Sequence, residues 1–156
     1  MASTIHKNIE VDVDVSTAYN QWTQFEDFPL FMKNIEEVRQ VDDTTLHWKG
    51  DIAGVERKWT AKITDQHPDQ RIAWRAEGEV THAGVVTFER LAANRTGIYL
   101  AFEYEPDDWR EKAADALNIT ERRVEGDLER FKEFIEERGG RETGDWRGDI
   151  DQEHRT

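Results

Sequence analysis

Three side chains in this sequence, His82, Arg57 and Tyr104, stand where polar chemistry inside a core is expected. His82 shares an alternating apolar stretch with Gly84, and it would act as a general base only with a suitable pKa and a substrate proton within reach. Arg57 has the same parity as Trp59, so its guanidinium is predicted to face inward and to hold a carbonyl or enolate oxygen. Tyr104 would offer a hydroxyl at the end of a strand. These are the catalytic candidates, and no motif assigns them a reaction.

The motifs of several enzyme classes are absent. The sequence has no Cys, and it contains neither HxxxH, HExxH nor a carboxylate–histidine cluster, so we expect no metal site. The phosphate-binding patterns GxGxxG and GxxxxGK(S/T) are missing, as is GxSxG. Ser3 and Ser16 are the only serines, and Ser16 is better explained as a helix cap. We therefore expect neither a cofactor nor a serine nucleophile.

Aromatic side chains are the second feature with chemical potential. The chain holds 6 Trp in 156 residues, and Trp22, Trp48, Trp59 and Trp74 fall on positions predicted to face the core. Indole rings at such positions either line a cavity and stack on a flat or polyenic ligand or pack as ordinary core side chains. The sequence leaves both interpretations open.

The charge balance excludes two classes of partner. Asp and Glu number 34 against 21 Lys and Arg, which gives a net charge of −13. This acidity disfavours binding to nucleic acid and to an anionic membrane surface. The apolar stretches are too short to span a bilayer, and the first residues lack the features of a signal peptide. With no Cys to form disulfides, a cytoplasmic protein of one domain is predicted, and no protein partner can be named.

Hydrophobic periodicity predicts the order of the elements in the first two thirds of the chain. Residues 3–13 alternate and predict a first strand. Ser16 is the expected N-cap of a short helix over residues 17–24, and Pro29 is expected in the first turn of a second short helix. Patterns of period two, separated by turn residues, then predict an antiparallel meander. Its six strands are residues 36–41, 45–51, 56–64, 71–77, 80–91 and 96–105.

The remaining chain is predicted to be mainly helical. A helix over residues 109–117 is expected to stop at Asn118, because Asn tolerates the left-handed conformation. A long helix follows and ends at Gly139 and Gly140. Its apolar residues recur at spacings of four, three and four, which makes one amphipathic stripe. The stripe consists of Val124, Leu128, Phe131 and Ile135.

One face of a single antiparallel sheet must be covered, and only the last helix is long enough to cover it. We therefore predict an α+β fold in which a curved antiparallel sheet of about seven strands wraps around a long C-terminal helix. The space between sheet and helix is the expected cavity. Residues 1–140 would form the domain, and the polar residues 141–156 are expected to form a mobile tail.

Eight short stretches carry a resemblance to a known family. They are residues 19–22, 25–29, 46–48, 71–74, 83–88, 104–106, 127–132 and 143–148. With the order of the elements, they resemble the START-like superfamily, also called SRPBCC or Bet v 1-like, whose fold is the helix-grip. Within it, the sequence looks like the bacterial polyketide cyclase/dehydrase family and the coenzyme Q-binding START-like proteins. The resemblance covers nearly the whole chain, and Asn118 departs from it where a Gly is common.

The resemblance implies a cavity that binds a lipid, quinone or polyketide, with Phe28, Phe31 and Met32 near its mouth. Affinity would come from burying apolar surface. We therefore predict a cofactor-free protein that carries or sequesters a hydrophobic small molecule. The predicted ligand-binding residues are Trp22, Phe28, Phe31, Met32, Trp48, Trp59, Trp74, Phe88, Phe102, Leu117, Val124 and Leu128.

Two other functions remain open at this point. A polyketide cyclase or dehydratase would fold a poly-β-ketone in the same cavity, largely by proximity. His82, Arg57 or Tyr104 would then assist proton transfer. An interaction module would instead present a helix or the acidic surface to a protein partner, and an exposed apolar patch on the last helix would support it.

Overall fold

Antiparallel strands build the main layer of the molecule. The computed structural model describes residues 3–52, 55–78, 82–104, 113–138 and 141–150. In these residues a 7-stranded sheet has the order β1-β7-β6-β5-β4-β3-β2, so β2 to β7 form a meander and β1 pairs with the last strand. The strands are β1 (Ser3–Val11), β2 (Ile35–Asp42), β3 (Thr45–Ile52), β4 (Val55–His67), β5 (Arg71–Gly78), β6 (His82–Ala92) and β7 (Arg95–Tyr104).

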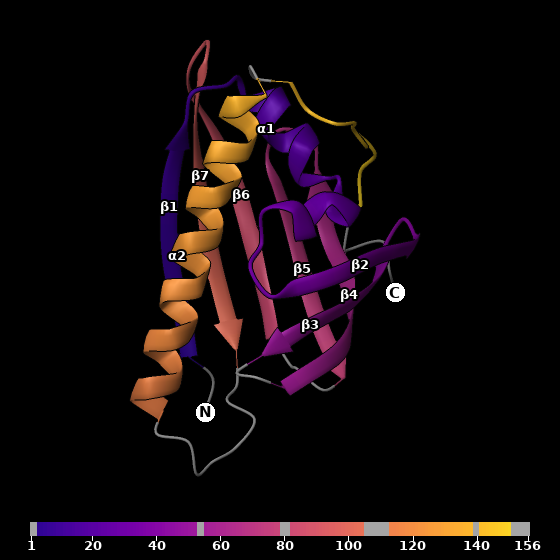
Figure 1. The fold of residues 1–156 in the computed structure, drawn as a ribbon. Helices are drawn as coiled ribbons and strands as arrows, with labels where there is room; N and C mark the ends of the chain where they lie inside the picture. Colours follow the sequence, from indigo (N-terminus) through magenta and orange to yellow (C-terminus); the bar gives the residue numbers. More distant parts are fainter. Residues whose placement is uncertain (1–2, 53–54, 79–81, 105–112, 139–140, 151–156) are drawn as a thin grey trace.

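Three helical elements cover one face of this sheet, as Figure 1 shows. Helix α1 (Val15–Trp22) contacts β6 and β7, the 3-10 helix η1 (Phe25–Leu30) contacts β2, and the long helix α2 (Ala113–Glu137) contacts β1. The sheet curves so that β2 and β3 pass in front of β4 and β5 in the view of Figure 1. A bulge between Ile63 and Asp65 lies on β4, where an extra residue increases the local twist. This curved sheet around a C-terminal helix agrees with the predicted helix-grip architecture.

The apolar stripe of α2 is buried by the core. Val124, Leu128, Phe131 and Ile135 are all buried, as the four-three-four spacing predicts for a helix that packs with one face. The stripe is therefore not available to a partner protein, which removes the observation that would have favoured an interaction module.

The start of the helical layer differs from the prediction in two details. Asp14, and not Ser16, is the N-cap of α1, because its Oδ1 accepts a hydrogen bond from the backbone N–H of Thr17 at 3.3 Å. The hydroxyl of Ser16 instead donates to Asp69 Oδ2 at 2.9 Å. Pro29 lies in the last turn of the second short helix, since η1 already begins at Phe25. An Asp one residue before the helix serves as well as Ser, so composition alone did not separate the two caps.

The predicted stop at Asn118 is wrong, because α2 runs without a break from Ala113 to Glu137. An Asn inside a helix costs only about 0.7 kcal/mol relative to Ala. Packing of the apolar stripe against the sheet outweighs a penalty of this size. The predicted helix over residues 109–117 lies partly outside the described residues.

The expectation of a mobile tail is wrong for residues 141–150. Ile150 is buried and forms an isolated antiparallel bridge with Gln66, with both N–H···O distances at 2.8 Å. Trp146 packs against the core, and Arg147 pairs with Asp69 at 2.8 Å. Two apolar side chains four residues apart thus anchor a polar segment. The domain limit at residue 140 remains a prediction, and residues 151–156 lie outside the described part.

The position of His67 on β4 follows from the same docked segment. Its Nε2 lies 3.0 Å from Asp65 Oδ1, and its Nδ1 lies 3.2 Å from Asp149 Oδ1. The ring is half-buried because Asp149 belongs to the segment that packs against β4. The contact between His67 and Asp149 joins residues 82 positions apart in the sequence, so no local pattern predicts it.

Candidate functional site

A group of aromatic side chains fills the space between α1, η1, α2 and the sheet. We call it the closed aromatic cluster. Trp22 contacts Phe131 at 4.9 Å and Phe88 at 6.0 Å between ring centroids, and Phe31 contacts Phe131 at 5.4 Å. All members are buried, so this cluster is a packed core. Its members are Tyr19, Trp22, Phe25, Phe28, Phe31, Phe88 and Phe131.

A second group lies on the same face of the sheet, and each of five consecutive strands contributes one ring. We call it the indole–imidazole cluster. Its members are Trp48 on β3, Trp59 on β4, Trp74 on β5, His82 on β6 and Phe102 on β7. Only Trp59 is fully buried, and the other four rings are partly exposed. Aromatic rings that face inward and yet keep exposed surface are typical of a ligand-binding wall.

The two clusters are continuous. Phe28 of the closed aromatic cluster contacts Trp48 at 5.8 Å between ring centroids. Trp48 and Trp59 are direct partners in the β3–β4 register, and their rings stack at 5.9 Å with an interplanar angle of 14°. A ligand on this wall would therefore lie directly beside the packed core.

Gly84 makes room for Trp74 in the indole–imidazole cluster. Gly84 pairs with Trp74 on β5 and with Phe102 on β7. A Cβ at position 84 would lie 2.7 Å from Trp74 Cη2 and 2.7 Å from the carbonyl oxygen of Ala101. The indole ring thus lies directly over the glycine backbone, and any larger residue would displace it.

His82 is held in one protonation state by its surroundings. Trp74 Nε1–H donates to His82 Nδ1 at 3.1 Å, so the neutral ring carries its proton on Nε2. Burial lowers the pKa of His82 from 6.5 to about 4, because the charged imidazolium is poorly solvated there. At neutral pH the ring is uncharged and its Nδ1 lone pair is engaged. His82 is therefore suited to donate a hydrogen bond from Nε2 and poorly suited to abstract a proton.

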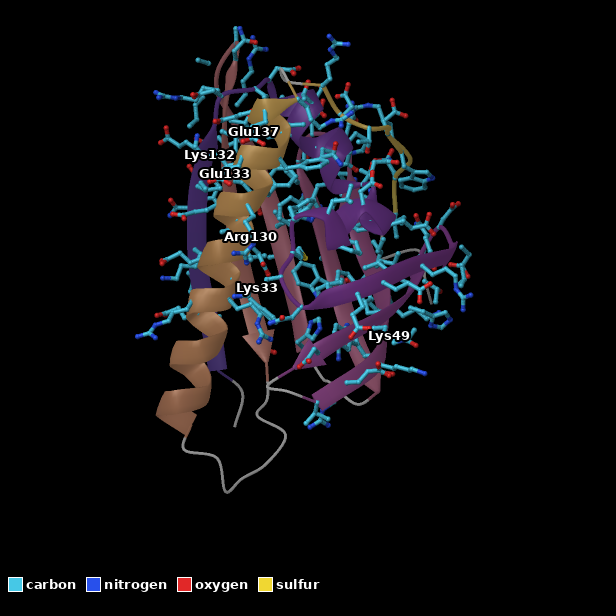
Figure 2. The ribbon with its side chains drawn as sticks, viewed as in Figure 1. Lys33, Lys49, Arg130, Lys132, Glu133 and Glu137 are labelled. Atoms are coloured by element: carbon cyan, nitrogen blue, oxygen red, sulfur yellow. The ribbon has the colours of Figure 1, made fainter. Side chains whose placement is uncertain are left out.

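The end of η1 is tied to α2 by a polar contact. Arg130 Nε donates to the carbonyl oxygen of Phe31 at 2.8 Å, and Arg130 Nη2 donates to Asp127 Oδ1 at 2.5 Å. The backbone N–H of Lys33 donates to the same carboxylate at 3.2 Å. Figure 2 shows Arg130 on α2 next to Lys33. Burial raises the pKa of Asp127, although these donors favour its ionised form. The contact fixes the chain around the predicted mouth residues.

The structure divides the predicted ligand-binding residues between these places. Trp22, Phe28, Phe31 and Phe88 belong to the closed aromatic cluster, while Trp48, Trp59, Trp74 and Phe102 belong to the indole–imidazole cluster. Val124 and Leu128 are buried on α2, and Met32 is partly buried against the core. The side chain of Leu117 lies outside the described part of the structure.

The three catalytic candidates are not equally placed. His82 lies within the indole–imidazole cluster, with its ring 5.0 Å from that of Phe102. Arg57 is half-buried on β4, two residues before Trp59 and opposite Gly50 in the β3–β4 register. The side chain of Tyr104 lies outside the described part. A cation and a neutral imidazole on one wall can polarise a carbonyl, whereas a strong base is not among the described members of the indole–imidazole cluster.

Two features of the site were not predicted from the sequence. The indole Nε1–H groups of Trp48 and Trp59 are buried and meet no acceptor among the described residues. Parity placed both rings inside, but the direction of an N–H depends on side-chain torsions that no pattern encodes. The role of Gly84 as a seat for Trp74 was also missed, although a glycine inside an alternating strand is a known signal of close approach.

The part of the chain that the structure describes contains neither a metal-binding group of side chains nor a membrane-spanning helix. There, no three His, Asp or Glu side chains gather in a way that could hold a metal ion. Neither α1, η1 nor α2 combines the length and apolar character needed to cross a membrane. The indole–imidazole cluster and its neighbours are thus the candidate functional site.

Comparison with known proteins places this architecture among relatives. A curated protein of Streptomyces lincolnensis, the "uncharacterized 17.2 kDa protein in melC2-rnhH intergenic region", is 50% identical over 149 residues, which cover 95% of this chain and 99% of that protein. A START superfamily protein from Mycobacterium smegmatis has a TM-score of 0.78 at 12% identity, covering 86% of this chain and 97% of that one. The Zhui aromatase/cyclase from Streptomyces sp. R1128 has a TM-score of 0.75 at 16% identity, covering 89% and 96%.

The two solved structures share the fold with this chain at low sequence identity. The family described as "Polyketide cyclase / dehydrase and lipid transport" matches residues 11–133. This match takes in α1, η1, strands β2 to β7 and most of α2, and so includes every described member of both aromatic clusters. The chain therefore belongs to the polyketide cyclase/dehydrase and lipid transport family, within the START superfamily fold.

Proposed function

We propose that this protein binds a hydrophobic small molecule between the inner face of the sheet and α2, against the indole–imidazole cluster. The observation that carries the proposal is the contrast in burial on one sheet face. Ile72, Val86 and Ile98 have relative exposures of 1%, 0% and 0%, whereas Trp74 and Phe102 on the same strands are partly exposed. Large aromatic side chains on the inner face gain most from an apolar ligand that covers them.

The ligand would be a lipid, quinone or polyketide-like molecule held mainly by apolar contact. Burial contributes about 25 cal/mol for each Å² of apolar surface, before the cost of association is subtracted. The four partly exposed rings, on β3, β5, β6 and β7, offer apolar surface of this kind. The description of the chain's family includes lipid transport, which supports the same class of ligand. We propose that this binding occurs in the cytoplasm and needs no cofactor.

Native mass spectrometry of gently purified protein, followed by organic extraction, tests this function. We expect a stoichiometric co-purifying hydrophobic mass that is lost in Phe102→Ala. Tyr99→Ala is the matched control, because Tyr99 is an exposed aromatic residue on the outer face of the same strand. A protein that carries no added mass, and that takes up no fluorescent probe such as 1-aminoanthracene, would contradict the proposal.

A cyclase or dehydratase reaction is the second candidate, favoured by the family description and by two polar side chains of the site, the half-buried Arg57 on β4 and the neutral His82 on β6. In such a reaction the two side chains would stabilise a developing enolate oxygen, while the wall would hold a poly-β-ketone in a folded shape. His82→Ala and Arg57→Ala separate the candidates. An enzyme turns over a poly-β-ketone and loses that turnover in both variants while the ligand stays bound, whereas a carrier binds the poly-β-ketone without turnover in the wild type and in both variants.

A further inference from the structure

Two polar groups in the candidate site have no role in the packing of the protein itself. The Nε1–H groups of Trp48 and Trp59 are buried, and neither has a hydrogen-bond acceptor among the described residues. Trp59 as a whole is 7% exposed. The third indole of the cluster differs, because Trp74 Nε1–H donates to His82 Nδ1. Buried polar groups are nearly always paired, so each exception asks for an explanation.

The two rings that carry these N–H groups lie side by side on one wall. Trp48 and Trp59 are directly opposite each other on adjacent strands, so both side chains project from the same face of the sheet. Their rings are nearly parallel, with centroids 5.9 Å apart. Both N–H groups thus belong to one pair of contacting rings.

We propose that Trp48 and Trp59 form a hydrogen-bond-donor site that binds a neutral carbonyl oxygen of the ligand. The inference rests on the proposed function, and it adds a specificity rule: a carbonyl-bearing ring system binds, and a hydrocarbon of the same shape binds weakly. Indole N–H groups only donate, so their partner must be an acceptor. Both donors are uncharged and lie among apolar rings, where an anion would be costly to bury.

Matched probes test the specificity rule. The probes are 2-methyl-1,4-naphthoquinone and 2-methylnaphthalene, which share a ring skeleton and differ in two carbonyl groups. The chain has no Cys that could add to the quinone. Isothermal titration calorimetry of the full chain should show the quinone binding about tenfold more tightly, as expected for one or two net hydrogen bonds. In ¹H–¹⁵N spectra, the indole signals of Trp48 and Trp59 should move downfield with the quinone and not with the hydrocarbon.

Variants assign the effect to these two residues. Trp48→Phe and Trp59→Phe keep an aromatic ring and remove the N–H, so each should bring the affinity ratio of the two probes toward one. Trp146→Phe is the matched control, because Trp146 packs against the core from the C-terminal segment, outside the indole–imidazole cluster. It should leave the ratio unchanged. The wild-type spectra decide the question even where a variant fails to fold.

Three outcomes would overturn the inference, and they are distinguishable. Equal affinity for both probes, with no movement of the Trp48 and Trp59 indole signals, would show that the indole–imidazole cluster binds ligands without recognising a carbonyl group. The proposed function would then stand without this specificity. If neither probe binds, the donor site and the proposed function fall together. A shift of other indole signals alone would place the carbonyl elsewhere and would also refute the assignment.

Discussion

The closed aromatic cluster and the indole–imidazole cluster are built from the same kinds of side chain on the same face of the sheet. They differ in how completely their rings are buried and their hydrogen-bond donors are paired. Phe131 is 0% exposed and contacts the rings of Trp22 on α1 and of Phe31, the C-cap of η1. Across the Phe28–Trp48 contact, every ring except that of Trp59 keeps exposed surface, and two indole N–H groups meet no acceptor among the described residues. Full burial indicates packing, whereas incomplete burial with unpaired donors indicates binding.

Truncation of one Phe in each cluster should give the largest difference between them. Phe131→Ala removes a ring that is completely enclosed, and we expect it to lower the free energy of unfolding by about 3–5 kcal/mol. Phe102→Ala removes a partly exposed ring, and we expect a loss of about 1–2 kcal/mol. Urea denaturation followed by far-UV circular dichroism measures both values. Equal losses would mean that the two clusters are one uniform core.

The depressed pKa of His82, in the indole–imidazole cluster, should make the stability of the protein depend on pH. The folded protein binds this proton only near pH 4, whereas the unfolded chain binds it near pH 6.5. Between these values the unfolded state holds more protons, so stability rises with pH across the window and is lost as pH falls toward 4. The expected gain is on the order of 3 kcal/mol.

The difference in unfolding free energy between the wild type and His82→Leu, measured from pH 4 to pH 7.5, isolates the contribution of His82 from that of the carboxylates. The variant loses the acceptor for Trp74 at every pH, so its constant penalty does not disturb the slope. A difference that does not vary with pH would contradict the assigned protonation state.

A methyl group at position 84 should displace the Trp74 ring in the indole–imidazole cluster. In Gly84→Ala the new Cβ would meet Trp74 and the Ala101 carbonyl oxygen at 2.7 Å each, so we expect a loss of about 1–3 kcal/mol. The indole signal of Trp74 should also shift, since its bond to His82 is displaced. In a Trp74→Ala background the same change should cost less, and a double-mutant cycle measures this coupling. Additive losses would show that the ring does not rest on Gly84.

The smallest expected effect concerns the docked C-terminal segment, residues 141–150. Arg147 pairs with Asp69, donates to Asn20 Oδ1 at 2.5 Å, and lies over the Tyr19 ring at 5.5 Å. Because the guanidinium is partly exposed, Arg147→Ala should cost about 1 kcal/mol or less and leave ligand affinity unchanged. Arg95→Ala, which removes an exposed ion pair with Glu10, is the control and should not change thermal stability. A loss of ligand binding in Arg147→Ala would contradict the assignment of ligand binding to the indole–imidazole cluster.

Sequence periodicity predicted most of the fold. Alternation placed Trp59, Trp74 and Phe102 on one face, and the helical spacing placed Leu128 and Phe131 in the core, because side-chain direction follows the backbone period. Strand ends were less predictable. The bulge between Ile63 and Asp65 carries β4 to His67, three residues beyond the alternating pattern.

What the sequence could not supply depends on contacts between distant segments. The docking of residues 141–150 rests on Ile150 meeting Gln66, which no local pattern predicts. The inward position of His82 followed from its parity, but its neutral state depends on burial and its tautomer on one hydrogen bond from Trp74. The sequence left open whether the Trp residues are core or cavity wall, because their exposure depends on the packing of distant segments; in the structure Trp22 and Trp59 are buried, and Trp48 and Trp74 are partly exposed.

A crystal structure of the protein with bound 2-methyl-1,4-naphthoquinone would test the central claim most directly. The account predicts ligand density against Trp48, Trp59 and His82, with a carbonyl oxygen within hydrogen-bond distance of an indole Nε1 and with the closed aromatic cluster unchanged. Density inside the closed aromatic cluster, between Trp22 and Phe131, or density only on the outer face of the sheet, would contradict it.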